Sequence, residues 1–175
     1  MTKVKFISTQ YIKENTSIED NVDDDKIVPY IHKAQDIHIQ QVLGSDFYTH
    51  IKNQIINGTV TPVEDSLLRD FIQPAIGEWA FYYSIPFLSN KITNKGVNKE
   101  TSQWSSNSDL NEVKYLQKSV RDIAEFYLER LIQYLCDNKA LFPVYQNATD
   151  KNMSKINKSY FSGIYLGDSK GCKGC

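Results

Sequence analysis

Apolar residues recur at intervals of three and four over most of residues 23–140, and this spacing is typical of amphipathic helices. The longest such stretch, residues 108–137, would form a helix of about 45 Å at 1.5 Å per residue. Beyond Pro74 the third stretch is apolar on most sides, so its helix is expected to be central. The pattern predicts four main helices, over residues 23–43, 45–57, 61–88 and 108–137.

Local signals mark where these helices begin and end. The acidic run Asp23–Asp25 suits a helix N-terminus, where free N–H groups and the macrodipole favour negative charge. Gly44 is a natural stop for the first helix, and Thr61–Glu64 is a capping box with proline at the first helical position. Pro74 removes an internal hydrogen bond and is expected to kink or split the third helix.

The segments outside these helices are expected to be extended. Residues 1–22 are expected to form an arm, with a short strand over Lys3–Thr9 and a helical turn over Thr9–Asn15. Residues 89–107 are expected to form a polar loop of about twenty residues, which ordinary domains rarely keep without a use. After Pro143 the helical pattern dissolves into a polar tail.

One aromatic island in this tail, Tyr160–Leu166, alternates like a strand. Such an island cannot form its own core, so we expect it to dock onto its own domain or onto a neighbouring chain. The predicted fold class is all-α: a small helical bundle of four main helices with an extended N-terminal arm and a C-terminal tail. The domain boundaries follow as an N-terminal arm over 1–22, a helical domain over 23–140 and an extended C-terminal tail over 141–175.

Composition places the chain among ordinary globular proteins. It has 175 residues, of which 41% are hydrophobic and 23% charged, and its net charge of -1 does not favour nucleic-acid binding by the chain as a whole. The charge is uneven, because residues 1–25 hold three lysines against six acidic residues and residues 149–175 hold five lysines against two. Ends of opposite sign suit either head-to-tail contacts between copies or two solvated segments.

The sequence pattern predicts neither a secretory signal nor a membrane span. The apolar patch after Lys3 and Lys5 is too short for a signal peptide, and no apolar run approaches the roughly 20 residues that a membrane span needs. Three cysteines are too few for a disulfide framework. The predicted setting is therefore reduced and cytosolic.

Catalytic signatures are missing from the sequence. The Gly-rich phosphate loop, the Gly-x-Ser-x-Gly elbow and the Glu-x-x-His pairs of di-iron bundles do not occur. His32 and Asp36 share a helix face and are candidates for part of a metal site, with a solvated or interface pair as the alternative. Cys172 and Cys175 have the spacing of half a zinc knuckle, with a terminal disulfide or a reactive tip as alternatives. We predict no catalytic, cofactor-binding or metal residue, and therefore no enzyme and no cofactor.

Aromatic residues make up 12% of the chain, and several fall in the predicted loop and tail. Tyrosine and tryptophan anchor protein interfaces because they bury much area at low entropy cost. Basic residues of the loop (Lys91, Lys95 and Lys99) with Trp104 could instead bind single-stranded nucleic acid. We predict a protein interface formed by Lys91, Thr93, Asn94, Lys95, Val97, Trp104, Tyr145, Tyr160, Phe161, Ile164 and Tyr165.

A set of segments also carries a resemblance to a known family. They span about residues 7–138 and are Asn15–Ile18 with Asn21–Asp23, Ile31–Tyr48 (including Ala34-Gln35 and Leu43-Gly44), Gln73–Ala75 with Trp79, Lys91–Val97, and Ala124–Tyr127. In their order and content they resemble the head-tail connector, or head-completion adaptor, proteins of tailed bacteriophages. The similarity is greatest to the versions in crAss-like and related phages of gut Bacteroidetes.

The resemblance implies a small helical adaptor whose copies form a homo-oligomeric ring, commonly dodecameric, below the phage portal protein. Such a ring extends the DNA channel without reading sequence and offers a platform to the tail or to further ring proteins. It implies a virion protein at the portal vertex of the capsid, made in the host cytoplasm, with no membrane partner. We expect the 89–107 loop and the 140–175 tail to reach neighbouring subunits.

The alternative is a phage DNA-binding or DNA-packaging accessory protein. It would place Lys91, Lys95 and Lys99 on phosphates and bind DNA with a steep salt dependence. A small enzyme with an unrecognised site is a third possibility, for which the sequence offers no convergent nucleophile and base.

Overall fold

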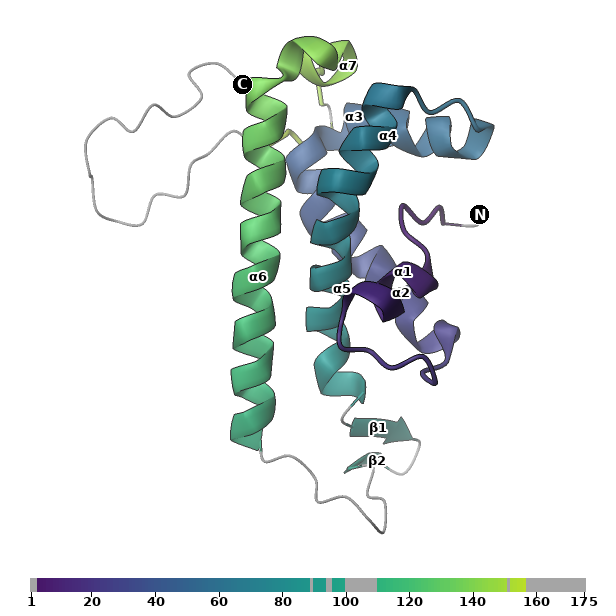
Figure 1. Ribbon diagram of the computed structural model, residues 1–175, viewed down its shortest axis with the longest axis vertical. Coiled ribbons are helices and arrows are strands. Elements are labelled where there is room, and N and C mark those ends of the chain that lie inside the picture. The colour runs from purple at the N-terminus through teal and green to yellow at the C-terminus, as the bar shows by residue number, and fades with distance from the viewer. Residues whose placement is uncertain (1–2, 89, 94–95, 100–109, 151, 157–175) are drawn as a thin grey trace, which may run out of the picture.

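The computed structural model describes residues 3–88, 90–93, 96–99, 110–150 and 152–156, and these residues form a helical bundle with a small hairpin at one end (Figure 1). The described elements are α1 (Thr9–Asn15), α2 (Asp24–Ala34), a π-helical turn (Gln35–Ile39), α3 (Gln40–Asn57), α4 (Pro62–Leu67), a second π-helical turn (Leu68–Ile72), α5 (Gln73–Leu88), β1 (Asn90–Thr93), β2 (Gly96–Lys99), α6 (Leu110–Asp137), a 3₁₀ turn (Lys139–Leu141) and α7 (Pro143–Gln146). The predicted all-α bundle is confirmed.

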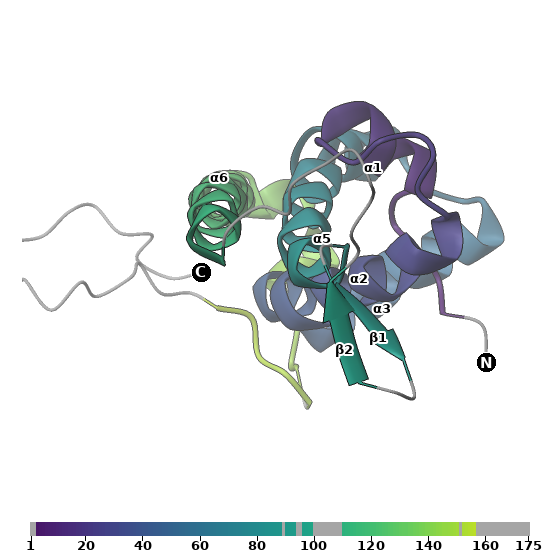
Figure 2. The same cartoon turned by 90° about the horizontal axis from the view of Figure 1, so that it is seen from below.

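Helix α5 is the centre of the bundle. It packs against α2 on one side and against α6 on the other, while α1 lies across it (Figure 2). Its buried side chains point to both neighbours, which matches the nearly uniform apolar sequence after Pro74. Helix α6 packs against α5 and the second π-helical turn, so it forms one edge of the molecule.

The regular helices are interrupted near the positions that the sequence predicts. Gly44 has φ 73° and ψ 164° and interrupts α3, so the first predicted helix does end there. At Pro74 the expected interruption is the π-helical turn Leu68–Ile72, in which the N–H of Gln73 donates to the carbonyl of Leu68. This turn ends two residues before Pro74, which cannot donate a hydrogen bond itself. The capping box at Thr61 and Glu64 forms as predicted.

The N-terminal segment packs on the bundle of its own chain. Phe6, Ile7 and Ile12 are buried, and two glutamine side chains hold the backbone of Phe6. Gln35 accepts from the Phe6 N–H at 2.9 Å, and Gln73 donates to the Phe6 carbonyl at 3.1 Å. The helical turn over Thr9–Asn15 is confirmed as α1, whereas the strand expected just before it does not form. Residues before α1 satisfy their backbone with side chains of the bundle instead of a neighbouring strand.

The start of the predicted C-terminal tail also belongs to the bundle, which corrects the boundary at residue 141. Phe142 and Tyr145 are buried against Phe47 of α3, with ring centroids 5.7 Å and 5.6 Å from it. The prediction that a polar tail follows Pro143 was wrong for residues 143–146. These residues form a single helical turn, α7, which buries Tyr145 against Phe47. Short contacts of this kind leave no periodic signal.

Residues 149–150 and 152–156 then run along α3 and are attached at its break. Asp46 accepts from the N–H groups of Thr149 and Asp150, both at 3.0 Å, and Asp150 in turn accepts from the Asp46 N–H at 3.1 Å. The N–H of Ile156 donates to the Gln41 carbonyl at 2.9 Å. The described part of the chain therefore ends beside α3.

The loop expected over residues 89–107 begins instead with an antiparallel hairpin of β1 and β2. Its register pairs Asn90 with Lys99 and Lys91 with Asn98. Gly96 is the first residue of β2, and alternation in so short a stretch is weak, so the pattern did not indicate strands. Residues 100–109 lie outside the described part of the chain.

Candidate interaction surface on the long helix

Helix α6 carries a stripe of large apolar side chains that face solvent. We define the α6 stripe as Tyr115, Leu116, Ile123 and Phe126, which are 78%, 45%, 44% and 60% exposed. At 3.6 residues per turn these positions fall within about 100° of one another around the helix. The core-facing side of the same helix buries Val120, Ala124, Leu131 and Leu135. Helix α6 is thus apolar on two sides, of which α5 covers one.

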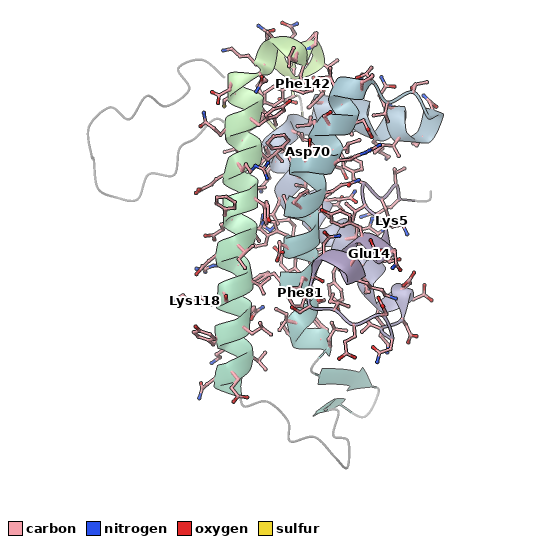
Figure 3. All side chains as sticks on the ribbon, in the orientation of Figure 1. Lys5, Glu14, Asp70, Phe81, Lys118 and Phe142 are labelled. Atoms are coloured by element: carbon pink, nitrogen blue, oxygen red, sulfur yellow. The ribbon has the colours of Figure 1, made fainter. Side chains whose placement is uncertain are left out.

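Contiguous apolar side chains on the surface of a monomer are characteristic of interaction sites. The α6 stripe lies along the edge helix of the bundle, and Lys118 projects from the same helix outside the stripe (Figure 3). On the far side of the molecule, the corner between α3 and α4 exposes Ile56 and Val63. The chain therefore presents apolar residues on two opposite sides.

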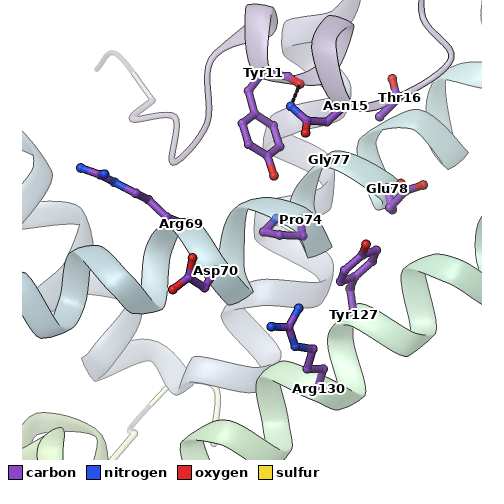
Figure 4. A pocket seen from close by; sticks show the side chains of 10 residues that line it. All are labelled: Tyr11, Asn15, Thr16, Arg69, Asp70, Pro74, Gly77, Glu78, Tyr127 and Arg130. Carbon is purple, nitrogen blue, oxygen red and sulfur yellow. Dashed lines mark hydrogen bonds between the residues drawn. The ribbon is translucent and has the colours of Figure 1, made fainter.

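A polar pocket adjoins the α6 stripe, where α1, α5 and α6 meet. Its volume is about 320 Å³. Figure 4 shows side chains from all three helices turned toward it, with Arg130 and Tyr127 coming from α6. Asn15 closes one edge and donates to the Tyr11 carbonyl at 2.9 Å. The lining residues are Tyr11, Asn15, Thr16, Arg69, Asp70, Pro74, Gly77, Glu78, Tyr127 and Arg130.

Burial dominates the electrostatics of this pocket. It raises the pKa of the Glu78 carboxyl, because the charged form loses hydration there. Burial likewise raises the pKa of the Tyr11 hydroxyl, with smaller contributions from Tyr127 and Glu78. The guanidinium of Arg130 stacks on the ring of Phe71 at 4.8 Å. Arg69 of the lining pairs with Asp65 at 2.7 Å, whereas Glu78 has no ion partner among the described residues.

A second, smaller pocket of about 140 Å³ lies between α3, α5 and α6 and contains a histidine, a residue often used in catalysis. The ring of His38 stacks on Trp79 with centroids 3.6 Å apart, and its Nε2 lies 2.9 Å from the Tyr83 hydroxyl. Burial lowers the pKa of His38 to about 4, so its imidazole is neutral at pH 7. The residues that line this pocket include no serine, threonine or cysteine that the imidazole would activate.

A second histidine, His50, pairs with the buried Glu64 and links two helices. His50 Nε2 lies 2.6 Å from Glu64 Oε1, and the second oxygen of Glu64 accepts from the Thr61 N–H at 3.0 Å. The pair therefore joins α3 to the first turn of α4. Backbone and side-chain hydrogen bonds to Thr61 and His50 hold the pKa of Glu64 below its usual value despite the opposing effect of burial.

In the part of the chain that the structure describes, no group of three or more His, Cys, Asp or Glu side chains is placed to hold a metal ion. The pair His32 and Asp36 was a candidate for part of a metal site. In the structure Asp36 instead forms an ion pair with Lys3 of the N-terminal segment at 2.6 Å. None of the described helices combines the length and the apolar character needed to cross a bilayer.

The structure places the predicted interface residues in three different settings. Lys91, Thr93 and Val97 lie on the strands of the hairpin. Tyr145 is 1% exposed in the core beside Phe47, so its assignment to an interface with another chain was wrong. Seven further residues lie outside the described part of the chain: Asn94, Lys95, Trp104, Tyr160, Phe161, Ile164 and Tyr165.

Sequence reasoning missed the α6 stripe. The apolar spacing over residues 108–137 predicted the helix but did not separate its exposed apolar side chains from its buried ones. A usable signal was present, because the apolar positions of α6 cover more of its circumference than one neighbouring helix can bury.

The family model described as "Family of unknown function (DUF6712)" matches residues 39–154. This range begins within the first π-helical turn and ends in the segment fixed along α3. No curated protein and no solved structure matches the chain.

Proposed function

From the premise that the chain belongs to the DUF6712 family, whose function is unknown, we propose that it is a structural virion protein of a tailed bacteriophage. Its copies form a ring below the portal, connect the capsid to the tail and extend the DNA channel. The chain carries no catalytic role in this proposal. The phage assignment rests on the sequence resemblance, and the contact between subunits rests on the α6 stripe.

The α6 stripe is the single observation that carries the assembly part of the proposal. When a neighbour covers these four large apolar side chains, their removal from water stabilises the contact by about 25 cal/mol per Å² of apolar surface buried. A ring requires two different contact surfaces on opposite sides of each subunit. The α6 stripe and the α3–α4 corner with Ile56 and Val63 supply such a pair.

The test mixes the purified chain with purified portal and measures the mass of the complex. We expect the double variant Ile123→Ser with Phe126→Ser to remain folded, because both side chains are exposed, and to lose ring formation. Lys118→Ser is the matched control, since it changes an exposed residue of the same helix outside the stripe. Unchanged assembly by the double variant would remove α6 from the proposed contact.

A gel-shift titration addresses the DNA-binding alternative. Strong binding that weakens steeply with salt would favour an accessory protein that contacts phosphates, and it would count against a ring through which DNA only passes.

A further inference from the structure

The polar pocket beside the α6 stripe contains an acidic group that has no counterion among the residues that the structure describes. Glu78 is half-buried on α5, and it forms no hydrogen bond or ion pair with the other described residues. The hydroxyl groups of Tyr11 and Tyr127 face the same space (Figure 4). Carboxylates that lose hydration on burial are normally paired, so an unpaired one at the mouth of a pocket indicates a missing partner.

Neither of the two arginines that line the pocket forms a described ion pair with Glu78. Arg69 pairs with Asp65 at 2.7 Å, and Arg130 stacks on Phe71 at 4.8 Å without an ion pair to the described residues. Asp70 adds a second carboxylate to the lining. With Arg69 neutralised by its own partner, the remaining ionised groups are two acids and one arginine. The pocket therefore favours a cation next to Glu78.

The sequence identifies which cation a second copy would offer. The chain contains three arginines, at positions 69, 121 and 130. Two of them line the pocket and Arg121 belongs to α6, where it lies 3.4 Å from Glu125. In a head-to-tail contact the facing surface is a different part of the molecule. Basic groups on that surface are therefore lysines.

We propose that this pocket receives the ammonium group of a lysine from the neighbouring copy, which binds Glu78 between the hydroxyls of Tyr11 and Tyr127. A lysine suits the site because its long stem can pass along the tyrosine rings while its three donors reach the carboxylate and both hydroxyls. This inference rests on the proposed ring, since it names the polar half of the same contact.

The pocket is continuous with the α6 stripe. Tyr127 and Arg130 follow Ile123 and Phe126 within the next turn of α6, so a subunit that covers the stripe also covers the pocket mouth. Apolar burial at the stripe then excludes water from the ion pair, which strengthens it. The pair would fix the register of one subunit on the next, a role that charge complementarity serves at many interfaces.

Zero-length cross-linking tests the proposal directly. A carbodiimide joins a carboxylate to an amine in contact with it, and a ring assembled on portal from equal amounts of light and ¹⁵N-labelled chain separates contacts between copies from contacts within one. We expect a cross-link from Glu78 to a lysine in peptides that combine light and heavy chains. Rings that form normally but yield intercopy cross-links without Glu78 would overturn the inference.

Two variants complete the test. Glu78→Gln keeps the shape of the side chain but removes the charge that burial opposes, so we expect a folded chain whose affinity for the ring falls at least about tenfold. Glu14→Gln, an exposed acid of α1, is the matched control and should leave assembly unchanged. Equal assembly by both variants would contradict the lysine pairing. Failure of the unmodified chain to form any ring would instead contradict the proposed function itself.

Discussion

At the scale of single residues, this structure depends on a few positions where the backbone or a charge is constrained by close neighbours. Gly44 and Asp150 make the clearest case. Gly44 has φ 73°, and a Cβ atom built there would lie 2.5 Å from a carboxylate oxygen of Asp150. That carboxylate accepts a hydrogen bond from the N–H of Asp46, where the second half of α3 begins. One glycine therefore permits both the break in α3 and the attachment of Thr149 and Asp150.

Replacement of this glycine should be costly for two reasons. Gly44→Ala combines a backbone conformation that favours glycine with a steric clash, and we expect it to lower the free energy of unfolding by more than about 2 kcal/mol. Gly58→Ala is the control, because Gly58 also has positive φ (65°) but has nothing within 4 Å of its Cβ position. It should cost about 1 kcal/mol. Urea unfolding of both variants measures the difference, and equal losses would contradict the clash.

His38 should make stability depend on pH. Burial lowers its pKa to about 4 in the folded chain, below the 6.5 of an ordinary histidine, so the unfolded chain takes up the proton first as pH falls. The free energy of unfolding should therefore decline between about pH 6.5 and pH 4, by about 1 to 2 kcal/mol after allowance for partial solvent exposure. In His38→Phe, which keeps an aromatic ring beside Trp79, this part of the pH dependence should vanish. An unchanged pH profile in that variant would contradict the assignment.

At the scale of elements, the ends of the chain are more firmly attached than their sequences indicate. α7 buries Tyr145, and residues 149 and 150 bind the break of α3 through Asp46 and Asp150. The bundle thus extends beyond residue 141 to at least Ile156. Residues 157–175, which contain the aromatic island, lie outside the described part of the chain.

Two truncations separate these parts of the tail. A chain that ends at Ile156 should keep its stability within about 0.5 kcal/mol, because it retains every buried residue of the described tail. A chain that ends at Pro143 loses the fully buried Tyr145 and the contacts of Asp150, and it should lose more than about 3 kcal/mol. Thermal unfolding of the two chains gives the comparison. Similar melting temperatures would show that residues 144–156 do not stabilise the bundle.

Much of the element order could be predicted because helices leave strong local signals. The capping box at Thr61, the stop at Gly44 and the interruption at Pro74 all depend on residues close in sequence, and all three form. The missed features depend on distant partners. Gln35 and Gln73 fix Phe6, and no local pattern reveals this pairing. The α6 stripe was missed because periodicity shows that a side is apolar but does not show which neighbour covers it.

At the scale of the whole molecule, the chain is a helical bundle with exposed apolar residues on α6 and at the opposite α3–α4 corner. Next to the α6 stripe lies Glu78, an acid with no ion partner among the described residues. These features suit a subunit that packs head-to-tail on copies of itself. The DUF6712 match covers most of the bundle but supplies no activity, so the account of assembly depends on these surfaces.

Electron microscopy of purified phage particles, reconstructed around the portal vertex, tests the central claim most directly. The account predicts a ring of this chain below the portal, with Ile123 and Phe126 of each copy covered by the next copy. Absence of the chain from mature particles, or a ring in which this side of α6 faces solvent, would contradict it.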